Sequence, residues 1–173
     1  MARSMGGDDF LVKNMEAEEL VAAVTITAER YRRLRHWMTC DSLTGLLNHT
    51  SLTARLERVV YHAQREKVPL AFAMVDIDHF KRINDSHGHP VGDRVIKSLA
   101  RLMRQSVVDA EAVGRYGGEE FAVIYNDLSL LRAAQQLDLM RERFAALDLR
   151  HGEGILRASF SAGIARLEPG MSA

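Results

Sequence analysis

The feature of this sequence that most restricts the fold is a pair of adjacent glycines, Gly117 and Gly118, between strand-like runs at residues 113–116 and 119–125. Glycine readily takes the positive φ angles that tight turns demand, so two such runs around two glycines predict a β-hairpin. A hairpin joins antiparallel strands. The sequence therefore argues against an all-parallel, doubly wound sheet and favours a mixed α/β (α+β) fold.

Hydrophobic periodicity predicts the remaining elements. We expect helices at residues 52–67, 79–85, 90–105 and 128–147. We expect further strands at residues 70–75 and 155–165. The first of these two is an unbroken apolar run, which predicts burial on both faces. Residues 41–48 contain a glycine and end in Asn48, a candidate helix N-cap, so we expect a turn there.

Composition narrows the class of protein. The chain has 173 residues, 23 Lys and Arg against 23 Asp and Glu, and 47% hydrophobic residues, as expected of one globular domain with a short additional element. A neutral chain favours neither nucleic acid nor an anionic membrane as a partner. The single cysteine, no signal peptide and no apolar run of membrane-spanning length lead us to expect a cytoplasmic protein.

The N-terminal region divides into two parts. Residues 1–15 show no periodicity, and we expect a leader or disordered tail. Residues 16–39 predict a helix with apolar residues at heptad spacing, interrupted by one threonine. The seam comprises Leu20, Val24, Thr27, Tyr31, Leu34 and Met38. This pattern fits a helix that pairs with a second copy, and it also fits a lone amphipathic helix packed on its own domain.

Acidic side chains occur at two places where chemistry is plausible. Asp76 and Asp78 follow the buried strand, and Glu119 and Glu120 follow the glycine pair. Each place has a structural explanation, since strand-end aspartates cap turns and hairpin glutamates are solvated. Together they fit a Mg²⁺ site, because this hard ion takes a few carboxylates plus water and phosphate oxygens. Such a site serves phosphoryl or nucleotidyl transfer.

Several ordered motifs resemble the GGDEF family of diguanylate cyclases. They are RYGGEEF at 115–121, DIDHFKRIND at 76–85, GHPVGD at 88–93, DSLTGLLN at 41–48 and SAGIA at 161–165. The resemblance implies a mainly antiparallel sheet flanked by helices, like the palm of polymerases and nucleotidyl cyclases. It also implies an enzyme that joins two GTP molecules into cyclic di-GMP with release of two pyrophosphates, working as a dimer with facing active sites.

The resemblance assigns roles near the metal. Asp76 and Glu119 match the side-chain ligands of Mg²⁺, with Mn²⁺ as a substitute, and the Ile77 carbonyl matches a main-chain ligand. Glu120 matches the second acid of the signature, which removes the proton of the 3′-hydroxyl or supports the metal. Gly117 and Gly118 match the glycines that border the substrate.

The same resemblance assigns residues to the nucleotide. Lys81 and the amides of His79 and Phe80 match phosphate contacts, in keeping with anion binding at a helix N-terminus. Asn84 and Asp93 match the guanine readers. Guanine presents N1–H and N2–H₂ side by side, which a carboxylate accepts, whereas adenine would leave that carboxylate unpaired.

Departures from the family pattern concern regulation and phosphate binding. His49 replaces the usual arginine after Asn48, and the Arg-x-x-Asp product site falls at residues 108–111, where Val108 and Glu111 stand instead. Arg104 lies one helical turn earlier but has no acid three residues on, so we expect no separate site for cyclic di-GMP. The family continues with a helix bearing Lys and Arg phosphate contacts, and we expect residues 40–173 to lack it.

Other interpretations remain open at this point. The chain is either an active cyclase, expected to act downstream of a sensor domain, or a catalytically inactive GGDEF-like module that binds GTP or serves in dimerisation and signalling. His79, His87 and His89 suggest zinc, but neither a cysteine nor a further histidine lies at ligand spacing. The signature-like residues 6–10 follow no strand, and we interpret them as a chance match.

Overall fold

The computed structural model describes the whole chain except residues 1–15, 108–109, 152–153, 169 and 172–173. The chain divides into two compact units, Met1–Thr39 and Cys40–Ala173. In the first unit, the described residues form helix α1, Ala17–Thr39. No helix among the described residues is both long and apolar enough to cross a membrane. The expected leader and the signature-like residues 6–10 lie outside the described part.

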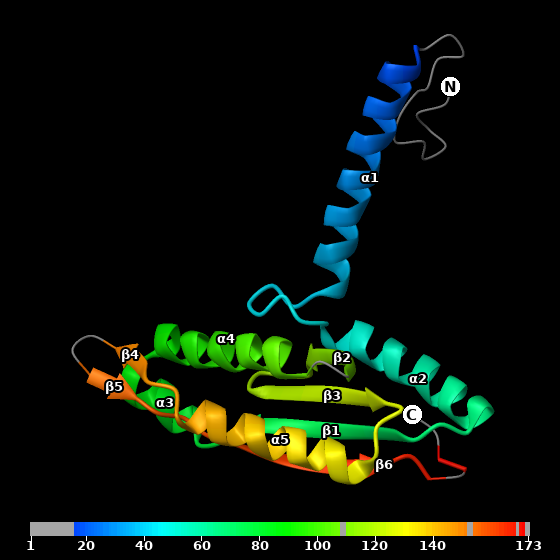
Figure 1. Ribbon diagram of the computed structural model, residues 1–173. Helices are drawn as coiled ribbons and strands as arrows, with labels where there is room; N and C mark the ends of the chain where they lie inside the picture. The colour runs from blue at the N-terminus through cyan, green and yellow to red at the C-terminus, as the bar shows by residue number, and fades with distance from the viewer. Residues whose placement is uncertain (1–15, 108–109, 152–153, 169, 172–173) are drawn as a thin grey trace. The chain divides into compact units, whose positions relative to one another are not determined.

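The second unit is built on a four-stranded antiparallel sheet (Figure 1). Its strands are β1 (Leu70–Ile77), β2 (Ala110–Arg115), β3 (Glu120–Asn126) and β6 (Phe160–Arg166). They lie in the order β2-β3-β1-β6, and every neighbouring pair is antiparallel. The predicted hairpin and the mixed helix and antiparallel-sheet fold are confirmed.

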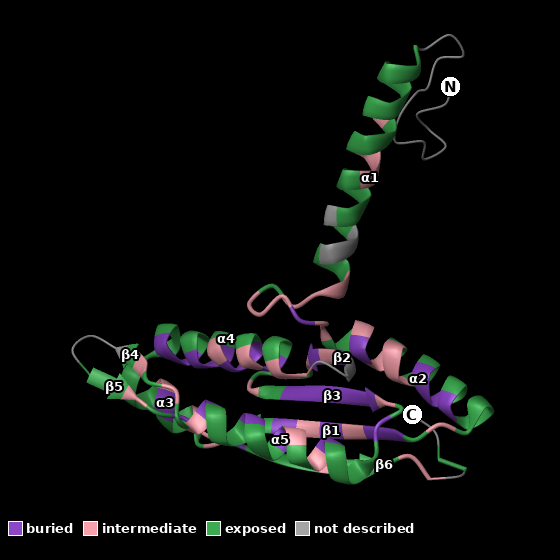
Figure 2. Ribbon diagram, viewed as in Figure 1, coloured by how far each residue is buried: buried purple, intermediate pink, exposed green. Residues whose placement is uncertain are grey.

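Helices pack on both faces of this sheet. They are α2 (His49–Glu66), α3 (Phe80–His87), α4 (His89–Ser106) and α5 (Leu130–Ala145). One core joins α4 and α5 to Val75 and Phe121, and a second core joins α2 to Ala122 and Ile124. Adjacent strand residues point to opposite faces, which explains why Phe121 and Ala122 belong to different cores. Figure 2 shows the resulting burial of β1 and β3.

Two details differ from the sequence-based expectations. The strand predicted at residues 155–165 is wrong as a single element, because β5 (Gly154–Leu156) pairs with β4 (Leu149–His151) in a separate hairpin. The chain leaves that hairpin before it enters the main sheet at Phe160. In β1, the side chains of Phe72 and Met74 are only half-buried, so full burial of both faces was also wrong.

Helix α1 presents its apolar residues to solvent. Leu20, Val24, Tyr31, Leu34 and Met38 are all exposed, as the green colouring of α1 in Figure 2 shows. Five exposed apolar residues at heptad spacing fit a partner helix. Pairing with a second copy stays a prediction.

Candidate active site

The carboxylates singled out in the sequence meet at one end of the sheet. In the β1–β3 pairing, Asp76 lies opposite Glu120, and the Ile77 amide donates to the Glu119 carbonyl at 3.4 Å. The side chains of Asp76 and Glu120 are exposed, and Glu119 is half-buried. Two segments more than 40 residues apart in the chain thus bring acidic groups to adjoining backbone positions.

The turn between β2 and β3 is held by its backbone. The amides of Tyr116 and Gly117 both donate to the Glu120 carbonyl, at 2.8 and 3.2 Å. Neither glycine of the pair has a positive φ, so the reason given above for glycine at this turn was wrong. An added Cβ at Gly117 would lie 2.5 Å from Glu120 Oε2, so a side chain there would have to displace the flexible, exposed Glu120 carboxylate. The Glu120 carboxylate therefore lies directly against the Gly117 backbone.

Arg115 ties this turn to the segment that precedes α2. Its guanidinium donates to the carbonyls of Gly117 and Gly118 at 2.7 to 3.1 Å, and to both carboxylate oxygens of Asp41 at 3.1 and 3.2 Å. Asp41 in turn accepts hydrogen bonds from the amide and hydroxyl of Thr44, at 2.9 and 2.7 Å. One side chain thus fixes the glycine turn against residues 41–48.

The ionisation of Asp41 follows from these contacts. Burial alone would raise its pKa, but the hydrogen bonds from Thr44 and the charge of Arg115 outweigh burial, and the net pKa lies below its usual value of 3.8. Asp41 is therefore an ionised anchor at neutral pH. Sequence reasoning gave no role to Asp41 or Arg115, although both lie within the motifs that it quoted.

Asp78 also acts as an anchor. Its carboxylate accepts hydrogen bonds from the hydroxyls of Ser159 and Ser161, at 2.5 and 2.7 Å. Burial would raise the pKa of Asp78, and these two hydrogen bonds bring it below the usual 3.8. Because Ser161 lies opposite Asp76 in the β1–β6 pairing, Asp76 and Asp78 share a side of the sheet, as predicted. Asp78 fastens the end of β1 to β6.

The predicted guanine readers lie on two consecutive helices. Asn84 is on α3, and its Oδ1 is buried without a hydrogen-bond partner among the described residues. Gly92 of α4 packs directly against that amide, because an added Cβ would overlap Asn84 Oδ1 and lie 3.0 Å from Phe80 Cζ. Asp93, the next residue, is exposed. An unpaired buried acceptor beside an exposed carboxylate fits a ligand that offers several N–H donors.

The residues predicted to bind phosphate follow β1 directly. His79 precedes α3 with φ of 55°, in the left-handed region, and its side chain does not cap the helix. Lys81, in the first turn of α3, is exposed. This places a cation and the amides of a helix N-terminus within a few residues of Asp76, an arrangement suited to a phosphate chain.

The acidic residues at this end of the sheet can be compared with the ligands that a metal ion requires. Among the described residues, no three His, Cys, Asp or Glu side chains gather as a metal-binding cluster. Mg²⁺ does not require one, since it is usually held by one or two carboxylates together with waters and substrate phosphates. Asp76 and Glu119 lie at adjoining backbone positions, and the Ile77 amide is hydrogen-bonded to Glu119, so these two carboxylates and the Ile77 carbonyl fit such a site.

Two residues that the sequence left unexplained have structural contacts. The His49 ring meets the Tyr116 ring edge-on, with centroids 4.4 Å apart, beside the glycine turn. Arg104 donates from Nη2 to the Thr44 carbonyl at 2.9 Å, so it supports residues 41–48. The expected absence of an Arg-x-x-Asp product site concerns residues 108–111, and 108–109 lie outside the described part.

Comparison with known proteins decides the family. The profile for the GGDEF domain of diguanylate cyclases matches residues 38–172. The chain belongs to the GGDEF family. Diguanylate cyclase DgcP of Pseudomonas aeruginosa is 41% identical over 128 residues, which cover 74% of this chain and 19% of DgcP. The response regulator PleD of Caulobacter vibrioides is 32% identical, over 94% of this chain and 38% of PleD.

Solved structures agree with this assignment. The coiled coil and GGDEF domain of DgcB from Caulobacter crescentus, solved with c-di-GMP, superposes with a TM-score of 0.77 at 30% identity, covering 91% of this chain and 86% of that chain. The curated relatives named above are much longer, so this GGDEF chain spans about a fifth of DgcP and two fifths of PleD.

Proposed function

We propose that this GGDEF domain is a diguanylate cyclase that condenses two GTP molecules into cyclic di-GMP and releases two pyrophosphates. The observation that carries the proposal is the β1–β3 register, which sets Asp76 opposite Glu120 and next to Glu119. These are the positions at which the family signature needs acids. The names of the relatives, DgcP among them, support the reaction class.

Mg²⁺, when bound, would neutralise charge on the phosphates and orient them for displacement. Asp76, Glu119 and the Ile77 carbonyl would hold the ion, and Mn²⁺ fits the same oxygen ligands. Glu120 has its carboxylate against Gly117, within the turn that borders the nucleotide, where it can accept the proton of the attacking 3′-hydroxyl. Lys81 and the amides of His79 and Phe80 would bind the phosphate chain.

Base selection follows from Asn84 and Asp93. The unpaired Oδ1 of Asn84 can accept one guanine N–H, and Asp93 can accept the paired N1–H and N2–H donors. Adenine would present an acceptor to the same carboxylate. We therefore propose that the domain takes GTP in preference to ATP.

Each domain has one set of these residues, so joining two nucleotides requires two domains with their sites facing each other. The exposed apolar seam of α1 supports a parallel helix pair, which would raise the effective concentration of one domain near the other. A sensor domain upstream would act through the same helix.

The test is conversion of GTP. We expect the chain with GTP and Mg²⁺ to form cyclic di-GMP, detected by chromatography, and Asp76→Asn to abolish turnover while the circular dichroism spectrum stays unchanged. Asp127→Asn is the matched control, because Asp127 is exposed at the opposite end of β3 and should leave turnover unaltered. Tight GTP binding without any product would favour the inactive, nucleotide-binding module instead.

A further inference from the structure

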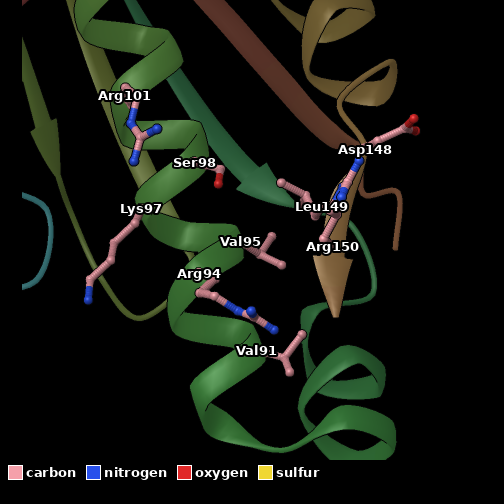
Figure 3. A pocket seen from close by; sticks show the side chains of 9 residues that line it. All are labelled: Val91, Arg94, Val95, Lys97, Ser98, Arg101, Asp148, Leu149 and Arg150. Atoms are coloured by element: carbon pink, nitrogen blue, oxygen red, sulfur yellow. The ribbon is translucent and has the colours of Figure 1, made fainter. Parts of the chain in front are cut away.

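A groove of about 350 Å³ lies between α4 and β4, apart from the residues assigned above to GTP and metal (Figure 3). Its lining comes from one face of α4 and from the strand that begins the small hairpin. Nine residues line it, namely Val91, Arg94, Val95, Lys97, Ser98, Arg101, Asp148, Leu149 and Arg150. The volume is in the range of small-molecule pockets, roughly 300–1,000 Å³.

The floor of this groove is apolar. Val91 and Val95 are buried members of the main core, and Leu149 packs against the same core. Figure 3 shows Val95 and Leu149 facing each other across the groove, with the Ser98 hydroxyl nearby on α4. A flat aromatic ring can cover such a floor and exclude water from it, with a hydroxyl at hand for one polar atom of the ring.

The rim of the groove is basic. Four cationic residues line it against one carboxylate, and that carboxylate, Asp148, already accepts from Arg157 Nε at 3.0 Å. For Lys97, Arg101 and Arg150, the structure gives neither an ion pair nor a side-chain hydrogen bond within its described part. The chain as a whole is neutral, so this concentration of positive charge is local.

The arginines of the rim come from both walls. In Figure 3, Arg94 extends from α4 toward β4, and Arg150 lies on β4 itself, whereas Lys97 points away from the groove. A guanidinium presents a planar fork of donors that matches phosphate oxygens and also stacks on an aromatic ring. Anionic ligands that enter the groove would therefore meet donors on both sides.

We propose that this groove binds a nucleoside monophosphate, with the phosphate at the basic rim beside Arg150 and the base over the apolar floor. A single-stranded nucleic acid fits less well, because such binders use aromatic platforms along an extended basic track, and the lining contains no aromatic residue. The site does not depend on the proposed cyclase activity.

AMP and adenosine are the probes for this site. AMP is chosen because adenine mismatches Asp93, so binding reports on the groove and not on the GTP site. We expect calorimetry on the full chain to show AMP binding and at least about tenfold weaker binding of adenosine, since adenosine lacks the phosphate. We expect AMP affinity to fall with rising salt.

Variants locate the binding. Arg150→Ala should weaken AMP binding at least about tenfold, whereas the control Arg143→Ala, at an exposed arginine of α5, should leave AMP binding unchanged. Asp76→Asn should also keep AMP binding, which separates this site from the metal site. Equal affinity for AMP and adenosine, no AMP binding at millimolar concentration, or full binding in the groove variant would overturn the proposal. Preference for an oligonucleotide over AMP would equally count against it.

Discussion

Replacement of Arg115 by alanine tests whether one side chain holds the active-site turn in place. The guanidinium donates to the carbonyls of Gly117 and Gly118 and to both oxygens of Asp41. Its removal takes this donor from the two carbonyls. It also leaves the Asp41 carboxylate, whose side chain is only 20% exposed, with Thr44 as its remaining partner.

The magnitude follows from the burial of the pair. Exposed ion pairs contribute about 0–1 kcal/mol, and breaking a fully buried pair costs about 3–5 kcal/mol. The Arg115 and Asp41 side chains, 17% and 20% exposed, lie between these cases, so we expect Arg115→Ala to lower the free energy of unfolding by about 2–3 kcal/mol. Domains of this size have about 5–15 kcal/mol, so the variant should still fold.

The assay is urea unfolding of wild type, Arg115→Ala, Asp41→Ala and the double variant. We expect a coupling free energy of about 1–2 kcal/mol at neutral pH. Because the pKa of Asp41 in the folded state lies below 3.8, the ionised carboxylate stabilises the fold above pH 3.8, and the coupling should disappear as pH falls below 3.8 through that lowered pKa. Additive changes in the free energy of unfolding, or a coupling free energy that stays the same at acidic pH, would refute the proposed interaction between Arg115 and Asp41.

Three further perturbations have defined outcomes. Gly92→Ala should displace Asn84 and weaken GTP binding at least about tenfold in calorimetry, with a stability loss of about 1–3 kcal/mol; unchanged GTP affinity would remove Asn84 from the site. Burial raises the pKa of Tyr125 to about 12, so the free energy of unfolding should fall by at most about 3 kcal/mol as pH rises from about 10 to 12, and Tyr125→Phe should abolish that fall. Leu34→Lys on the exposed seam should shift the chain toward monomer in sedimentation, and a monomeric wild type would contradict the helix-pair proposal.

The sequence predicted the hairpin and the meeting of acids at one sheet end because both depend on local pattern. Strand alternation and a turn between two apolar runs suffice to place Glu119 directly before β3 and Glu120 at its first position. The physical reason given for Gly117 was nevertheless wrong, since its φ is not positive, and the structure instead places the Glu120 carboxylate close beside its backbone. Such a contact is visible only once the side chains are placed.

The sequence pattern could not predict contacts between residues far apart in the chain. The Arg115–Asp41 pair joins residues 74 positions apart, and neither residue differs by pattern from a solvated surface charge. The hydrogen bond from Arg104 to Thr44 spans 60 positions. The sequence predicted one strand where the structure has two, β5 and β6, because apolar residues recur throughout residues 154–166. The two strands are distinguished by pairing, since β5 pairs with β4, and this contact is not visible in the sequence pattern.

The hydrophobic core itself sets the geometry of the acids. Val75 and Phe121 are opposite one another in the β1–β3 pairing and are 1% and 0% exposed, and the next pair outward is Asp76 with Glu120. A slip of one residue would turn β3 over and move Phe121 into the core under α2, where the small Ala122 packs, and such overpacking costs about 1–3 kcal/mol. The register that packs Phe121 in its core therefore also places Asp76 opposite Glu120. Packing in the core in this way determines how the acidic residues at the end of the sheet are arranged.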